Sequence, residues 1–121
     1  MNKDWLLLVE KYDFAGARTK FESICETLFK KIYPDKYVKT VKANPGDEGI
    51  DVLIGEIGVE PIDVIQCKFF PNSFEQSQKA QIKKSFNTAV DSTKFDTKSW
   101  TLCLINIFDI DQHIWWNRWK N

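Results

Sequence analysis

Apolar residues near the start of the chain recur with the spacing of an α-helix. From Phe14 to Ile32 they lie mostly three or four positions apart, which places them on one face of a helix, and Pro34 ends the pattern. A shorter apolar segment precedes them, within residues 4–12. We therefore expect two consecutive helices, the first over residues 4–12 and the second from Phe14 to Tyr33.

The middle of the chain has the composition of β-strands. Segments rich in Val, Ile and Phe and bounded by Gly or Pro predict a meander of three strands, at residues 37–41, 50–57 and 62–70. Residues 74–91 are polar and compatible with a helix. The apolar run from Trp100 to Phe108 is typical of a central strand that is covered on both faces. The last expected element is a short helix that carries three tryptophans, Trp115, Trp116 and Trp119.

This order of elements predicts an α/β fold. A three-strand meander followed by a helical crossover to a further strand gives a mixed central β-sheet flanked by α-helices. With 121 residues, of which 43% are apolar, the chain is long enough to bury a core of its own. We expect residues 1–121 to form a single domain.

Charge and cysteine content exclude several kinds of protein. The chain has 17 basic and 17 acidic residues, so no global charge attracts it to nucleic acid and any basic surface must be local. Its three cysteines and single histidine lack the spacing of a zinc ribbon or a disulfide framework, which favours a reducing, cytoplasmic location. The early apolar run from Trp5 to Val9 is too short to span a membrane.

Two polar residues interrupt the apolar strand expected at residues 62–70. Gln66 and Lys68 lie two positions apart and therefore share one face of the strand, whereas Cys67 lies on the other face. Burying them is costly unless they have partners or a function. With Asp51 on the neighbouring strand they supply a carboxylate, an amide oxygen and a strand carbonyl, an oxygen-rich set suited to Mg²⁺. A lysine beside a metal-bound water completes what phosphodiester hydrolysis requires.

The same residues resemble a known family of nucleases. Gly-Asp-Glu-Gly-Ile-Asp51, followed after 14 residues by Gln66-Cys67-Lys68, resembles the PD-(D/E)xK restriction-endonuclease-like superfamily. Within it, the chain is most similar to the Mrr-type branch, which has Gln at the acidic position of the second half-motif. The preceding Phe21-Glu22 is similar to the first helix of this family, which carries an accessory Glu. The resemblance covers residues 14–108, and residues 107–119 further resemble N-terminal domains of multidomain bacterial anti-phage proteins.

The resemblance implies a restriction-endonuclease-like core and a Mg²⁺- or Mn²⁺-dependent endonuclease that hydrolyses DNA in bacterial restriction or defence. Asp51 would bridge the metal, together with the side-chain oxygen of Gln66 and the main-chain carbonyl of Cys67. Lys68 would orient the attacking water. Glu22 would bind the metal or support its ligands. Glu26, one helical turn further on, competes with Glu22 for this place.

Two departures from the family pattern bear on activity. Ile50 replaces the Pro of the family's name, which is a common change. Gln66 replaces an acid, and the loss of one negative charge should weaken metal binding. Either Glu22 compensates, or the chain is an inactive relative that keeps the nuclease fold as a module for binding nucleic acid or protein. Asp47 and Glu48 are expected to be turn residues rather than ligands.

Two further features concern partners. Lys79, Lys83 and Lys84, on the helix after the third strand, are expected either to contact the phosphates of double-stranded DNA or to form an ordinary solvated face. The tryptophans at the end of the sequence expose a large apolar area unless something covers it. They either pack back on the sheet or, through Trp115 and Trp119, meet a second copy of the chain or a following domain of a longer protein.

Overall fold

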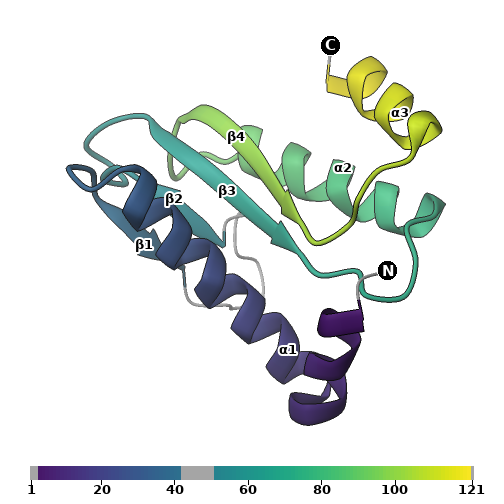
Figure 1. Cartoon of the computed structure of the whole chain (residues 1–121). Helices are drawn as coiled ribbons and strands as arrows, with labels where there is room; N and C mark the ends of the chain where they lie inside the picture. Colours follow the sequence, from purple (N-terminus) through teal and green to yellow (C-terminus); the bar gives the residue numbers. More distant parts are fainter. Residues whose placement is uncertain (1–2, 42–50, 121) are drawn as a thin grey trace.

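The chain folds into an α/β structure in which helices cover both faces of one mixed β-sheet (Figure 1). The computed structural model describes residues 3–41 and 51–120. Its elements, in chain order, are α1 (Lys3–Ile32), β1 (Val38–Thr40), β2 (Val52–Ile54), β3 (Ile62–Lys68), α2 (Gln76–Val90), β4 (Thr97–Leu104) and α3 (Ile110–Lys120). No helix among these residues is long and apolar enough to cross a membrane.

In the described part of the chain, the strands of the sheet lie in the order β1-β2-β3-β4. The first three form an antiparallel meander, in which Val52 of β2 lies opposite Thr40 of β1 and Ile65 of β3. β4 runs parallel to β3, with Cys103 opposite Cys67, and α2 makes the crossover between them. The predicted α/β class, with a three-strand meander, a crossover strand and flanking helices, is therefore confirmed.

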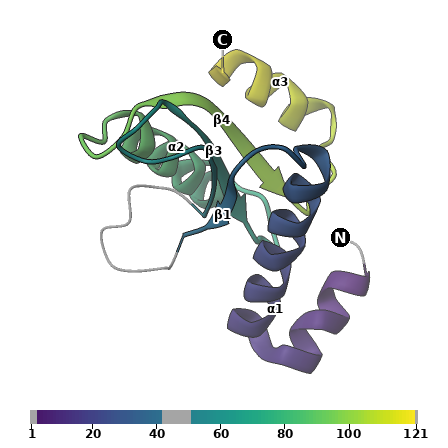
Figure 2. The same ribbon diagram turned by 90° about the vertical axis from the view of Figure 1, so that its left-hand side faces the viewer.

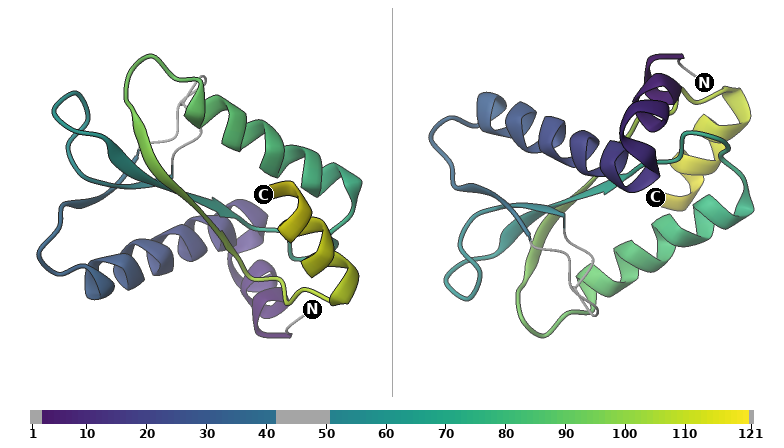
Figure 3. Two further views of the ribbon diagram at one scale, coloured as in Figure 1. Left: turned by 90° about the horizontal axis from the view of Figure 1, so that it is seen from above. Right: turned by 90° about the horizontal axis from the view of Figure 1, so that it is seen from below.

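Alternation along β3 builds a core on each face of the sheet. Ile65 and Cys67 face α1, whereas Val64 packs on the opposite side. The buried residues on the α1 side are Ala17, Phe21, Cys25, Val38, Val52, Ile54, Ile65, Cys67 and Phe69. Those on the α2 side are Leu53, Ile62, Val64, Ala89 and Phe95. Because α1 and α2 lie on opposite sides of the sheet (Figure 3), β3 is covered on both faces.

α1 consists of two helical segments that change direction at Asp13 (Figure 2). The backbone angles of Asp13, φ 62° and ψ −178°, lie outside the helical region. Its Oδ1 accepts a hydrogen bond of 2.8 Å from the N–H of Gly16. This contact caps the second segment, because a side-chain oxygen that reaches the N–H three residues later has the geometry of an N-cap. The two predicted helices, before and after residue 13, are confirmed.

The apolar stripe predicted along the second segment of α1 is only partly buried. The residues that face the sheet are Ala17, Phe21 and Cys25. Other members of the stripe remain about half exposed, namely Phe14, Ile24, Leu28 and Ile32. The stripe is wider than the sheet it covers, since the short strands β1 and β2 offer little surface to the end of the helix.

The prediction of a central strand from Trp100 to Phe108 is wrong. β4 spans Thr97–Leu104 and lies at the edge of the described sheet, while β3 occupies the centre. The chain leaves the strand soon afterwards, and Ile107 is 94% exposed. The segment is apolar because its residues pack against the core clusters on both faces of the sheet, Trp100 on the α2 side and Ile105 on the α1 side.

Aromatic side chains attach α3 to the rest of the molecule. The ring of Trp119 lies edge-on to Phe86 of α2 and Trp100 of β4, with centroids 5.3 and 6.2 Å away. Trp115 lies 5.8 Å from Phe74, which precedes α2. Trp115 and Trp119 therefore pack back on the molecule, the first of the two predicted alternatives, and α3 lies beside α2 (Figure 1).

Candidate functional site

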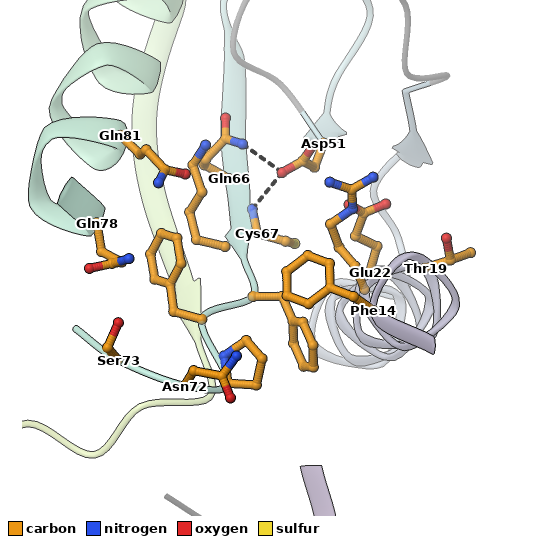
Figure 4. A pocket seen from close by; sticks show the side chains of 15 residues that line it. Phe14, Thr19, Glu22, Asp51, Gln66, Cys67, Asn72, Ser73, Gln78 and Gln81 are labelled. Atoms are coloured by element: carbon orange, nitrogen blue, oxygen red, sulfur yellow. Dashed lines mark hydrogen bonds between the residues drawn. The ribbon is translucent and has the colours of Figure 1, made fainter. Parts of the chain in front are cut away.

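A cleft of about 520 Å³ opens between α1 and α2 at the C-terminal end of β3 (Figure 4). Its walls come from both helices, from β3 and from the segment that follows β3. The polar side chains among its lining residues are Arg18, Thr19, Glu22, Asp51, Gln66, Lys68, Asn72, Ser73, Gln78 and Gln81. The structure thus brings the four residues predicted to be catalytic to one place, Glu22, Asp51, Gln66 and Lys68.

Asp51 is held in the sheet immediately before β2. Its main-chain N–H donates to the carbonyl of Ile65 at 3.2 Å, and its carbonyl accepts from the N–H of Val41 at 2.8 Å. The carboxylate Oδ2 accepts two hydrogen bonds from β3 (Figure 4). These come from Gln66 Nε2 at 2.6 Å and from the main-chain N–H of Cys67 at 2.7 Å. The carboxylate is therefore fixed near the C-terminal end of β3.

Gln66 is a buried polar residue, with 5% of its surface exposed. The sequence predicted that its side-chain oxygen acts together with Asp51, but in the structure the amide nitrogen faces the carboxylate. The reason is that an N–H can donate to a carboxylate, whereas a carbonyl oxygen cannot. Oε1 is left buried, and no group in residues 3–41 or 51–120 forms a hydrogen bond with it. A half turn of the terminal side-chain torsion, which is soft in Gln, exchanges the two atoms.

The structure separates the two candidate glutamates of α1. Glu22 lines the cleft, where burial and the nearby Asp51 carboxylate raise its pKa. Glu26 instead accepts a hydrogen bond from the Thr40 hydroxyl of β1, and its Oε1 lies 3.6 Å from Lys30 Nζ. The hydrogen bond from Thr40 is the main reason why the pKa of Glu26 is lowered. Of the two, Glu22 is the one that shares a site with Asp51.

Lys68 lines the cleft at the last position of β3, on the same face as Gln66. Burial lowers its pKa, the Asp51 carboxylate raises it, and the positive charges of Arg18 and Lys84 lower it. The net result is an ammonium group that gives up its proton more easily than a lysine in water. Such a pKa is typical of lysines that position or deprotonate a water molecule.

The three lysines predicted to contact DNA have different surroundings on α2. Lys84 does not line the cleft, but its positive charge is near enough to lower the pKa of Lys68. Lys83 is exposed, and both residues line a shallow hollow on α2. Lys79 has its ammonium 5.2 Å from the ring centre of Trp115, in a cation–π contact. Lys84 is therefore the best placed of the three to act together with the cleft residues.

Six polar residues that line the cleft were not predicted, namely Arg18, Thr19, Asn72, Ser73, Gln78 and Gln81. Arg18 influences the charges of both Glu22 and Lys68. Gln78 and Gln81 reach the cleft from α2 (Figure 4). Arg18 stands one helical turn before Glu22, and the two glutamines stand one turn apart, so helical spacing was the available signal. Nothing in the sequence said which side of α2 faces the site.

Cys67 contributes its main chain to the site and its thiol to the core. Its N–H holds Asp51, while its side chain points to the α1 side and is 4% exposed, which confirms the prediction that the thiol is a core group. There it meets Cys25 and Cys103. Hydrogen bonds with Cys103 raise the pKa values of Cys67 and Cys25, and the same bonds lower the pKa of Cys103.

The segment that leads into Asp51 in the motif is not part of the described structure. Residues 46–50, which include the expected turn residues Asp47 and Glu48, lie outside the described residues. Comparison of the chain with protein-family models, with curated proteins and with solved structures finds no match. The function has to be argued from the cleft itself.

Proposed function

We propose that the chain is a metal-dependent endonuclease domain that hydrolyses the phosphodiester bonds of DNA and has the restriction-endonuclease-like core of the PD-(D/E)xK nucleases. The observation that supports this most is the approach of Glu22 to Asp51 near the buried oxygen of Gln66, which has no hydrogen-bond partner among the described residues. Like charges close together are unfavourable, and a buried oxygen without a hydrogen bond is costly. Once a half turn of the Gln66 amide brings Oε1 toward Asp51, a divalent cation bound among these oxygens would relieve both costs.

The donor set suits Mg²⁺ or Mn²⁺, which both prefer oxygen ligands. Asp51 and Glu22 would supply carboxylate oxygens, Gln66 its Oε1, and Cys67 its main-chain carbonyl. Gln66 brings no charge, so Asp51 and Glu22 carry the whole negative charge of this set. Glu22 would thereby supply the negative charge that is missing because Gln66 stands at the acidic position of the second half-motif.

The residues of the cleft would have different roles in hydrolysis. A bound divalent cation would lower the pKa of a coordinated water and offset the charge that develops on the phosphate. Lys68, whose pKa is lowered by burial, orients the attacking water and can accept its proton. Arg18 and Lys84 place positive charge beside the cleft, where it attracts the phosphate. The hydrogen bond from the main-chain N–H of Cys67 holds Asp51 in place whichever way the Gln66 amide is turned.

The proposed substrate is double-stranded DNA, and the proposed setting is restriction or anti-phage defence, as the sequence resemblance implies. Lys83, which is exposed next to Lys84, extends the positive charge along α2 away from the cleft. Contacts of this kind position a duplex without reading its sequence. Lys79 is less available for such a contact because its ammonium lies over Trp115.

Cleavage of a supercoiled plasmid in Mg²⁺ or Mn²⁺ tests the proposal. The wild-type chain should cut only when the metal is present. Asp51→Ala, Lys68→Ala and Glu22→Gln should each lose about 100-fold or more of the rate, because each removes a metal ligand or the group that handles the water. Glu26→Gln is the matched control, since Glu26 is on the same helix but bonded to Thr40, and it should cut like the wild type.

Other outcomes of the cleavage experiment would lead to different conclusions about the site. Unchanged cutting by Asp51→Ala or Lys68→Ala would reject the assigned site. If the wild-type chain neither cuts DNA nor gains thermal stability with either metal, the alternative holds, namely an inactive nuclease fold kept for binding nucleic acid or protein. Gln66→Glu should tighten Mg²⁺ binding by adding a carboxylate, if the site is active but short of charge. Single-stranded DNA and RNA of matched sequence, tested in parallel, identify the preferred nucleic acid.

A further inference from the structure

Cys25, Cys67 and Cys103 meet in the core although they lie far apart in the sequence. Their Sγ atoms all lie within 4.8 Å of one another. Cys25 and Cys67 are each 4% exposed, Cys103 is partly buried, and all three are free thiols. A cluster of three sulfur atoms is thus enclosed between α1 and the sheet.

Regular elements, rather than loops, hold this cluster. Cys67 and Cys103 are register partners on the parallel strands β3 and β4, so their side chains leave the sheet on the same face. Cys25 lies on the buried side of α1, one turn after Phe21 and two turns after Ala17. No loop has to become ordered to bring the sulfurs together. The cluster is therefore preorganised for a ligand that needs all three.

The number and kind of ligands select the metal. Within the described residues, no His, Asp or Glu ligand atom joins the three sulfurs. Structural zinc sites and iron–sulfur clusters take four ligands, and the burial of the cluster leaves little room for water as a fourth. The soft ion Cu⁺ accepts three sulfur ligands. With metal–sulfur bonds of about 2.3 Å, a trigonal site needs sulfurs about 4 Å apart, a spacing that this cluster approaches.

The charge balance also favours a monovalent ion. Cu⁺ can replace a single thiol proton without changing the net charge of the core, whereas a divalent ion has to displace two protons to do the same. Each further thiolate ligand would release one more proton to the solvent and leave one more negative charge in the core, so the neutral site keeps one thiolate and two thiols. No oxidation state changes. The Asp51 carboxylate is close enough to act on the thiols of Cys25 and Cys67, and its negative charge attracts a cation.

We propose that Cys25, Cys67 and Cys103 form a binding site for one soft monovalent metal ion, Cu⁺, in each chain. Its sulfur donors lie on the α1 face of the sheet, whereas the proposed magnesium site uses oxygen donors in the cleft. The inference therefore does not rest on the proposed nuclease function. The two sites are neighbours, because the main-chain N–H of Cys67 binds Asp51.

Anaerobic titration of the reduced chain with Cu⁺, in competition with a chromophoric Cu⁺ chelator, tests the site. The wild type should withdraw one equivalent of Cu⁺ from the chelator and develop thiolate-to-metal charge-transfer absorption. Cys25→Ala and Cys103→Ala should each lower the affinity about tenfold or more, because two ligands remain. His113→Ala, which removes the single histidine of the chain, is the control and should bind as the wild type does.

A second measurement uses only the wild type, so it does not depend on the folding of the variants. One equivalent of Cu⁺ should raise the Tm by about 5 °C or more, since the ion joins three elements of the native core. An unchanged Tm would overturn the proposal. So would a wild-type affinity for Cu⁺ in Cys25→Ala or Cys103→Ala, or a loss of binding in His113→Ala.

Discussion

At the scale of single residues, two glutamates one turn apart on α1 have opposite electrostatic environments. Burial and the Asp51 carboxylate make the ionised form of Glu22 unfavourable. The Thr40 hydroxyl and the Lys30 ammonium make the ionised form of Glu26 favourable. The first environment is unfavourable for folding but favourable for binding a cation, which is the combination found at functional sites.

Replacement of Glu22 should therefore stabilise the metal-free protein at neutral pH. The folded-state pKa of Glu22 is raised above its ordinary value of 4.5, so the native state binds the proton more tightly than the unfolded state, and stability falls as the pH rises through this window. Because the Glu22→Gln variant has no carboxyl group at this position, its stability does not fall with rising pH in this way. Urea denaturation should give it a higher midpoint than the wild type at pH 7 and above, with the gain fading as the pH falls through the folded-state pKa and absent below 4.5.

The matched variant Glu26→Gln should behave in the opposite way. The pKa of Glu26 is lowered in the folded state, so its stabilising contribution is fully present above the ordinary value of 4.5 and disappears as the pH falls through the folded-state pKa. Its urea midpoint should lie below that of the wild type at pH 7 and converge with it in acid. The same sign for both variants would contradict the assigned environments.

At the scale of elements, the break in α1 determines how the helix covers the site. The first segment turns back so that Trp5 packs edge-on against Phe21 of the second segment, with ring centroids 5.5 Å apart. Trp5 also lies 6.0 Å from Phe69, which follows β3. A straight helix would carry Trp5 away from both rings. The break at Asp13 thus closes the apolar core beside the cleft.

Asp13→Ala should destabilise the protein by about 1–2 kcal/mol. It removes the side-chain oxygen that caps Gly16, and it places a Cβ-bearing residue without a compensating side-chain hydrogen bond at φ 62°. Asp13→Asn is the control, because Asn keeps an oxygen acceptor and tolerates positive φ. Urea denaturation of the two variants measures the difference. Equal stability of Asp13→Ala and the wild type would mean that the cap contributes nothing.

At the scale of the whole molecule, α3 is joined to the α/β core mainly by rings. Trp119 contacts Phe86 and Trp100, which belong to α2 and β4. The ring neighbours of Trp116 are Trp115 and Trp119, both on α3 itself. Two tryptophans of one helix therefore differ in whether they join it to the rest of the chain.

Trp119→Ala should cost about 2–3 kcal/mol of unfolding free energy, because it removes the ring that joins α3 to two other elements. Trp116→Ala should cost clearly less, since its ring contacts lie within α3. Urea denaturation compares the two variants. Sedimentation of the wild type and of Trp119→Ala tests the further expectation of self-association through this helix, which predicts a lower mass for the variant.

Much of the fold followed from local pattern. The helical spacing after Phe14, the meander and the opposite faces of Gln66 and Cys67 were all predictable, because periodicity follows from the covalent geometry of helices and strands. The position of β4 was not predictable. An apolar run shows that side chains are covered, but it does not show whether the cover is a strand, a helix or an aromatic ring, and β4 proved to be an edge strand.

For the candidate site, too, some features could be predicted from the sequence and others could not. The sequence by itself determined which chemical groups are present and which face of β3 carries Gln66 and Lys68. Only the tertiary structure decided that Glu22 rather than Glu26 approaches Asp51, that the amide nitrogen of Gln66 faces the carboxylate, and that three distant cysteines meet. These outcomes depend on distances between elements that are remote in the chain. Packing of α1 against the sheet sets those distances, and no local pattern encodes them.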